Sequence, residues 1–217
     1  MYFLFNWFIK ITAFPIYWVI LRPKISYEDK KVQSRRIRGR AIVVSNHHSV
    51  LDVAVMLFTF PFRTLRCAVA ELMYRKNIFM TLLLRGMGTV KVDRDMHDFS
   101  FLTAFQKILD RGGVVEIYPE SRLPKQGEKL PLEFKPSAVY LALQTGAPII
   151  PVCQNGRYFT KKRMRIIIGT PIDVRSLYKE ELSEKDNLVN ITNHIRGKII
   201  EFQKQLEQQE NKARDTR

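Results

Sequence analysis

Two histidines and an aspartate lie close together in segment 46–52, which reads NHHSVLD. A histidine can accept a proton near neutral pH, and a neighbouring carboxylate can fix its tautomer and stabilise the imidazolium that forms. A His–Asp pair therefore suits activation of a hydroxyl group. On a helix His48 would share a face with Asp52, whereas His47 can pair with Asp52 only from a loop before the helix. Spacing alone leaves both histidines open, and a polar helix N-terminus with incidental histidines is the structural alternative.

Further charged side chains follow short apolar runs. Arg94 comes after a strand-like run, and Glu120 with Arg122 ends another one. An Arg after a strand is usually solvated, but a Glu and an Arg at the end of a buried strand need mutual pairing or a ligand. Lys135 supplies one more cation, before a helical segment. These residues are candidate binding groups for an anionic substrate.

Strand-like runs alternate with helical patterns along most of the chain. The strand-like runs are 41–44, 64–70, 89–92, 114–118, 149–153 and 164–168, and the helical segments are 50–60, 72–84, 99–109, 135–144 and 183 to beyond 202. This alternation predicts an α/β fold with a largely parallel or mixed central sheet and helices on both faces. Segment 46–52 lies where a strand gives way to a helix, which is where open α/β folds bind ligands.

The first 24 residues are apolar and aromatic, interrupted by Asn6, Lys10 and Pro15. Asn6, Lys10 and Tyr17 fall on one narrow helical stripe, and apolar side chains occupy the rest. This pattern favours a helix at a membrane interface, with a single tilted span and a buried core helix as the alternatives. A secretory signal fits poorly, because a basic start and a small-residue cleavage site are missing.

The charge of the chain indicates an anionic partner. Thirty-six Lys and Arg against 21 Asp and Glu give a formal net charge of +15. Segment 22–40 is especially basic and follows the apolar start, which favours acidic lipid headgroups over nucleic acid, with a solvated linker as the alternative. Cys67 and Cys153 stand in apolar surroundings far apart, so we expect core thiols and a reducing compartment.

Four segments, taken in order, resemble the lysophospholipid and glycerol-phosphate acyltransferase family, whose prototype is 1-acylglycerol-3-phosphate acyltransferase. The resemblance covers roughly residues 40–155. The family's NHxxxxD box matches Asn46, His47 and Asp52, which implies that His47 is the base and that His48 occupies a variable position. A serine hydrolase fits less well, because the chain has no GxSxG motif to carry a serine nucleophile.

The remaining boxes match with departures. Gly88 and Arg94 match the second box, and Glu120 and Arg122 match the third, where Ser121 replaces the usual glycine. Two further features match the family: Lys135 follows Phe134 as in the family's FK pair, and the run 148–152 is apolar and bracketed by prolines. Two positions depart from it: Lys91 replaces an apolar residue, and Ser137 replaces a common glycine. Because Ser resists conformations that Gly permits, Ser121 puts the choice of substrate in doubt.

The resemblance implies a direct acyl transfer from a thioester to lysophosphatidic acid, giving phosphatidic acid in phospholipid biosynthesis. In it His47 would deprotonate the acceptor hydroxyl, Asp52 would orient His47, and Glu120 would contact the glycerol part. The phosphate would be bound by Arg94 and Arg122, with Lys135 as a helper. The donor would be acyl-CoA or acyl-acyl carrier protein, with no permanently bound cofactor or metal. Another lysophospholipid or an aminolipid is the alternative acceptor, and a non-catalytic binder of anionic membrane or nucleic acid is the alternative class.

Three regions are expected from these patterns. They are a membrane-associating helix at 1–24, a catalytic domain at 25–205 and a polar tail at 206–217. The expected partners are a phospholipid membrane surface, a lysophospholipid and the acyl donor, without nucleic acid. The expected location is the cytoplasmic face of a membrane, the cell membrane if the protein is bacterial.

Overall fold

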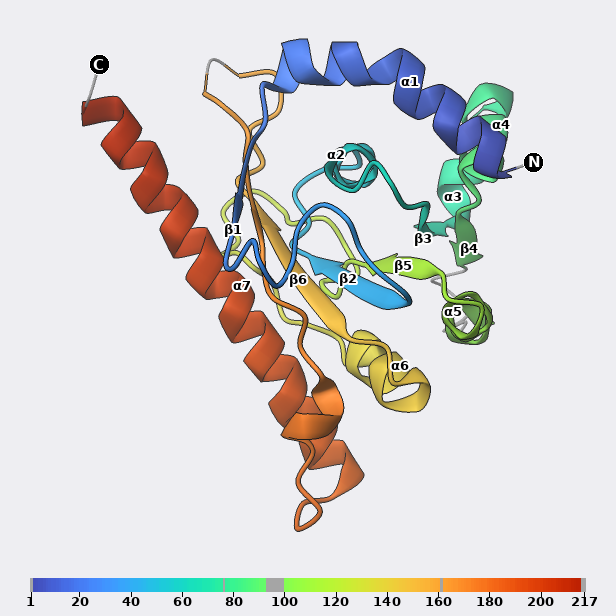
Figure 1. The fold of residues 1–217 in the computed structure, drawn as a ribbon, viewed down its shortest axis with the longest axis vertical. Coiled ribbons are helices and arrows are strands. Elements are labelled where there is room, and N and C mark those ends of the chain that lie inside the picture. The colour runs from blue at the N-terminus through green and yellow to red at the C-terminus, as the bar shows by residue number, and fades with distance from the viewer. Residues whose placement is uncertain (1, 76, 93–99, 161, 216–217) are drawn as a thin grey trace.

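A seven-stranded sheet forms the centre of the molecule (Figure 1). A computed structural model describes residues 2–75, 77–92, 100–160 and 162–215. The strand order is β1-β7-β6-β2-β5-β3-β4, and neighbouring strands are parallel except for the antiparallel pair β6–β7. The strands are β1 Lys24–Tyr27, β2 Ala41–Ser45, β3 Leu65–Ala70, β4 Val90–Val92, β5 Val114–Ile117, β6 Ile149–Gln154 and β7 Arg165–Ile168.

Helices cover both faces of this sheet, which confirms the predicted α/β fold. Alternate residues of β2 enter two cores: Ile42 and Val44 pack with α5, α6 and α7, whereas Ala41 and Val43 pack with α1 and α2. Burial on both faces explains the continuous apolar runs of the central strands. The helices are α1 Tyr2–Leu21, α2 Asp52–Thr59, α3 Glu71–Tyr74, α4 Ile78–Met87, α5 Ser100–Asp110, α6 Ser137–Thr145, the 3-10 helix η1 Val174–Leu177 and α7 Glu184–Asp215.

Two elements differ from the pattern-based expectation. Strand β1 lies within the basic segment and pairs with β7 at the sheet edge, where only Ile25 and Tyr27 of its side chains pack against the core. The side chains of this edge strand are only partly buried, so its sequence lacks the apolar run by which the other strands were predicted. The single helix expected at 72–84 is two helices, α3 and α4, and the Asn77 carbonyl accepts the first hydrogen bond of α4. Asn is among the residues preferred at a helix N-cap.

The C-terminal residues 206–217, expected as a polar tail, continue α7 as far as Asp215. Leu206 is buried, and Glu210 accepts hydrogen bonds from Asn155 and Arg157 of the β6–β7 loop. The helix passes beyond the apolar core here and makes charged contacts, which explains its polar composition.

Helix α1 has its polar stripe turned inward. Asn6 and Lys10 are buried, and Lys10 Nζ donates to the carbonyls of Pro61 (2.9 Å) and Arg63 (2.6 Å). Tyr17 stacks on Phe58 of α2 at 4.7 Å between ring centroids. Several apolar side chains face outward, including Leu4, Phe8, Ile11 and Val19, whereas Ile9, Ala13, Phe14 and Leu21 pack against the core. The segment Leu4–Leu21 has a mean hydropathy of 1.5 and is long and apolar enough to cross a membrane.

Candidate active site

The loop between β2 and α2 folds around the buried carboxylate of Asp52. Asp52 is the first residue of α2 and is 0% exposed. Its Oδ2 accepts the backbone N–H groups of His48 (2.7 Å) and Ser49 (3.0 Å). A short carboxylate side chain commonly organises a turn in this way. Residues 46–51 therefore precede the helix, and residue spacing on a helix face does not apply to them.

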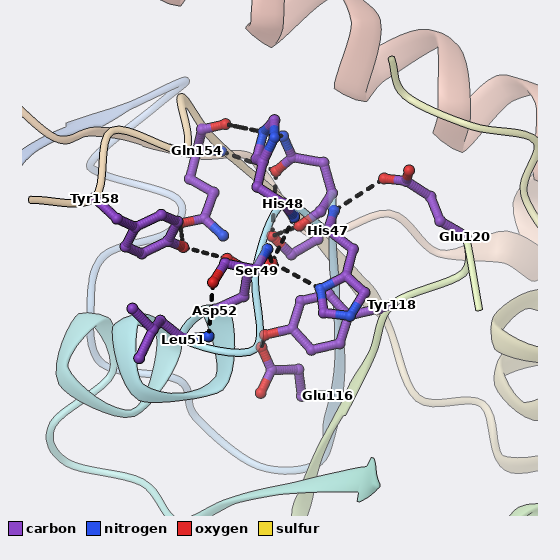
Figure 2. Close-up of polar contacts among 12 residues, drawn as sticks. His47, His48, Ser49, Leu51, Asp52, Glu116, Tyr118, Glu120, Gln154 and Tyr158 are labelled. Carbon is purple, nitrogen blue, oxygen red and sulfur yellow. Dashed lines mark hydrogen bonds and ion pairs between the residues drawn. The ribbon is translucent and has the colours of Figure 1, made fainter. Parts of the chain in front are cut away.

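His47 pairs with Asp52 across this loop. His47 Nδ1 lies 2.7 Å from Asp52 Oδ2, and the His47 side chain is 12% exposed (Figure 2). Since a carboxylate only accepts, Nδ1 carries the shared proton and the imidazole presents Nε2 as its acceptor. This is the orientation that a general base requires.

The ring of His48 turns to the other side of the loop. The Asn46 side-chain oxygen accepts the backbone N–H of Gln154 (3.0 Å), so the Asn46 amide nitrogen faces the Gln154 carbonyl (2.9 Å) and His48 Nε2 (2.8 Å). Gly156 lies against the same ring, where a Cβ would come within 2.8 Å of it. The geometry thus pairs His47 with Asp52 and gives His48 a structural contact.

Tyr158 also binds Asp52, and the sequence analysis missed it. Its hydroxyl donates to Asp52 Oδ1 and lies 2.9 Å from the side-chain amide of Gln154. Rotating that amide lets Gln154 Nε2, which otherwise lacks a hydrogen-bond partner among the described residues, donate to the Tyr158 hydroxyl. Burial alone would raise the pKa of Asp52, but the hydrogen bonds from His47, Tyr158 and the Ser49 amide outweigh burial and lower it. Asp52 is therefore an anion at neutral pH.

Tyr118 fixes the plane of the His47 ring. The two rings stack with centroids 4.4 Å apart and an interplanar angle of 23°. The Tyr118 hydroxyl donates to Glu116, a buried side chain of β5 whose pKa is raised to about 8 by burial and by the charge of Asp52. Glu116 is thus largely protonated at neutral pH, and it adds no second negative charge beneath the His–Asp pair.

Glu120 connects the His47 loop to the loop that follows β5. It is 3% exposed; Oε1 accepts the backbone N–H of His47 (2.9 Å), and Oε2 accepts that of Leu132 (3.0 Å). Ser121, next to it, has φ +57°, in the left-handed region that glycine favours. This conformation explains why a glycine suits that position better than the serine found here.

The predicted phosphate-binding residues are less closely assembled. Arg122 is exposed and forms a bidentate pair with Glu128, with both N–O distances 2.7 Å. Glu120 and Arg122 therefore have different partners: the Glu120 carboxylate accepts backbone N–H groups, and the Arg122 guanidinium binds Glu128. Lys135 is exposed, and its backbone N–H donates to the Pro119 carbonyl. Arg94 lies outside the described residues.

The arrangement combines an oriented His47–Asp52 pair with exposed cations. Within the described part of the chain, no group of three or more His, Cys, Asp or Glu side chains is placed to hold a metal ion. Cys67 and Cys153 are free and buried, as expected of core thiols.

Comparison with known proteins places this site in a family. The family model described as Acyltransferase matches residues 24–155. Human 1-acyl-sn-glycerol-3-phosphate acyltransferase beta is 31% identical over 126 residues, which cover 56% of this chain and 45% of that protein. The bovine alpha form is 28% identical over 151 residues, covering 65% and 52%. The chain thus spans about half the length of the curated relatives it matches.

A solved structure supports the fold. The crystal structure of the 1-acyl-sn-glycerophosphate (LPA) acyltransferase PlsC from Thermotoga maritima aligns with a TM-score of 0.62 at 20% identity, covering 91% of this chain and 78% of that one. The family match includes β2, the loop around Asp52, β5 with the loop after it, and β6, which carry the site residues other than Tyr158. The chain belongs to the Acyltransferase family.

Proposed function

We propose that this protein transfers a fatty acyl group from an acyl thioester to the hydroxyl of lysophosphatidic acid, giving phosphatidic acid for phospholipid biosynthesis. The observation that carries the proposal is the 2.7 Å contact of His47 Nδ1 with the buried carboxylate of Asp52. The names of the relatives support this acceptor. Another lysophospholipid or an aminolipid is the alternative acceptor.

The reaction would proceed without a covalent acyl-enzyme. His47 Nε2 takes the proton of the acceptor hydroxyl while its oxygen attacks the thioester carbonyl. A C–O bond forms, the C–S bond breaks, and the proton on His47 passes to the departing thiolate. Asp52 stabilises the imidazolium between these steps, and Tyr118 keeps the ring in one plane. No resident cofactor takes part in this scheme, and the thiol carrier is coenzyme A or acyl carrier protein.

Cations near the base would bind the acceptor's phosphate. Arg122 has the bidentate geometry that suits a phosphate, and it would exchange Glu128 for the substrate. Lys135 and Arg94 would add charge. Glu120 would reach the glycerol part only through the lone pairs that its two backbone contacts leave unused.

Helix α1 would dock the enzyme on a membrane. A helix with Asn6 and Lys10 buried against the protein and Phe8, Ile11 and Val19 exposed has the reverse of the polarity that water favours. A bilayer interface accommodates such an outward apolar face, with aromatic side chains at headgroup depth. We therefore assign residues 1–24 to membrane docking. The free thiols of Cys67 and Cys153 suit a reducing compartment, so the active site would face the cytoplasm, at the cell membrane if the protein is bacterial.

Thiol release from acyl-CoA or acyl-acyl carrier protein tests the proposal directly. The detergent-purified chain should release thiol only when lysophosphatidic acid is added. His47→Ala should abolish this release, and the adjacent His48→Ala is the matched control that should retain most of it. Loss confined to His48→Ala would refute the assigned base. If no donor and no lysolipid gave release above background, the protein would instead be a non-catalytic lipid binder.

A further inference from the structure

The loop between β6 and β7, residues 155–164, carries an outward aromatic side chain next to an inward one. Phe159 is 70% exposed and has φ +51°, a left-handed conformation that bulky residues rarely adopt. The preceding Tyr158 points into the active site and donates to Asp52 (Figure 2). Two consecutive residues of this loop thus point in different directions, Tyr158 into the active site and Phe159 into solvent.

This loop joins the C-terminal end of α1. Arg163 Nε donates to the Arg22 carbonyl (2.7 Å), and the Met164 N–H donates to the Leu21 carbonyl (3.3 Å). In Figure 1 the loop rises from the sheet to the level of α1. Near this end of α1, Val19 is 76% exposed. The loop that carries Phe159 is therefore fastened to the end of α1 at which Val19 is exposed.

The loop that carries Phe159 contains several cations and no carboxylate of its own. The loop contributes Arg157, Lys162 and Arg163, and Lys24 follows at the start of β1. Glu210 of α7 is the carboxylate that pairs with them, at 3.2 Å from Arg157 and 3.6 Å from Lys162. An exposed ring flanked by surplus cations matches the chemistry of an anionic bilayer surface, where the ring enters the headgroup region and the cations meet lipid phosphates.

We propose that the β6–β7 loop is a second lipid-contacting element, which inserts Phe159 into the headgroup region of an anionic bilayer beside α1. The inference rests on the proposed docking of α1 and adds a separate surface to it. Nucleic acid also attracts cations, but the exposed Phe159 ring and the exposed apolar side chains of α1, to whose end the loop is bonded, favour a bilayer. Tyr158 precedes Phe159 and donates a hydrogen bond to Asp52. Insertion of Phe159 would therefore also restrain Tyr158 when the enzyme is bound to its membrane.

A fluorescent label on the full-length chain tests the proposal. The natural Cys67 and Cys153 are buried, so a polarity-sensitive thiol dye will react with an introduced exposed cysteine. Phe159→Cys carries the probe. Tyr178→Cys is the control, because Tyr178 is exposed and follows η1, which packs on α6 on the opposite sheet face from α1. Vesicles of phosphatidylcholine, with and without phosphatidylglycerol, are the ligands, and flotation measures binding of each labelled chain.

With anionic vesicles, the label at 159 should shift to the blue, brighten severalfold and be quenched by lipids carrying a nitroxide near the headgroup, while the label at 178 stays unchanged. If the chain floats but the 159 label behaves like the 178 label, this inference fails and the docking of α1 stands. If the chain does not float, both fail. A 159 response to duplex DNA but not to vesicles would assign the loop to nucleic acid and overturn the proposal.

Discussion

The two halves of the candidate active site are held in opposite ways. Asp52, in the half that contains the base, is 0% exposed and accepts hydrogen bonds from two side chains and two backbone N–H groups. In the cationic half, the Arg122 side chain is 47% exposed and its paired residue, Glu128, lies in the same loop. We infer from this contrast that the geometry of the His47–Asp52 pair is set before substrate binds, whereas Arg122 would have to leave Glu128 to bind a phosphate.

Asp52→Asn should produce the largest loss, because it disrupts the preorganised half without changing its shape. An amide in place of the carboxylate removes the charge that stabilises the imidazolium and can turn the His47 tautomer. We expect kcat to fall by about 10²–10⁴-fold, with little change in KM for the acceptor. Steady-state thiol release measures both constants, and circular dichroism checks the fold. A large rise in KM with unchanged kcat would mean that Asp52 binds substrate instead.

Tyr158→Phe should have the next largest effect. It removes one donor to an ionised carboxylate, a bond worth about 1.5–3 kcal/mol, so we expect a loss of about tenfold or more in kcat. Because this hydrogen bond lowers the pKa of Asp52, its removal raises that pKa, and the acidic limb of the kcat profile should move to higher pH. Tyr178→Phe on the exposed surface is the matched control. An unshifted acidic limb would leave Tyr158 with a packing role only.

Arg122→Ala tests the adaptable half. We expect KM for lysophosphatidic acid to rise about tenfold with a smaller change in kcat, since a charge-assisted contact to substrate is lost. Arg122→Lys should be intermediate, because Lys keeps the charge without the bidentate geometry. A monoacylglycerol acceptor, which has no phosphate, is the control, and its KM should not respond. Equal effects on both acceptors would argue against a phosphate contact.

The same contrast explains what the sequence could predict about the site. The His47–Asp52 pair comes from one short segment, so its motif was visible, although geometry was needed to show that the loop places His48 elsewhere. Tyr158 lies more than a hundred residues from Asp52 and reaches it only because β2 and β6 are neighbours. Nothing in the local pattern of residues 155–160 signals that contact.

The fold follows a similar rule. The central strands were predictable because burial on both faces requires continuous apolar runs. Strand β1 at the sheet edge and the end of α7 were not, because partners distant in sequence stabilise them rather than their own composition. For β1 the partner is β7, and for α7 the contacts include those of Glu210 with the β6–β7 loop.

Glu128→Gln should give the smallest effect, and it has the opposite sign. The Arg122 guanidinium and the Lys125 backbone N–H lower the pKa of Glu128 to about 2, so Glu128 is an anion that competes with a substrate phosphate for Arg122. The variant weakens this competitor, and we expect KM for lysophosphatidic acid to fall about two- to threefold with kcat unchanged. Glu133→Gln, an exposed change in the same loop, is the control for loss of negative charge. A rise in KM would mean that Glu128 presents Arg122 to the substrate rather than occupying it, and the cationic half would then be preorganised as well.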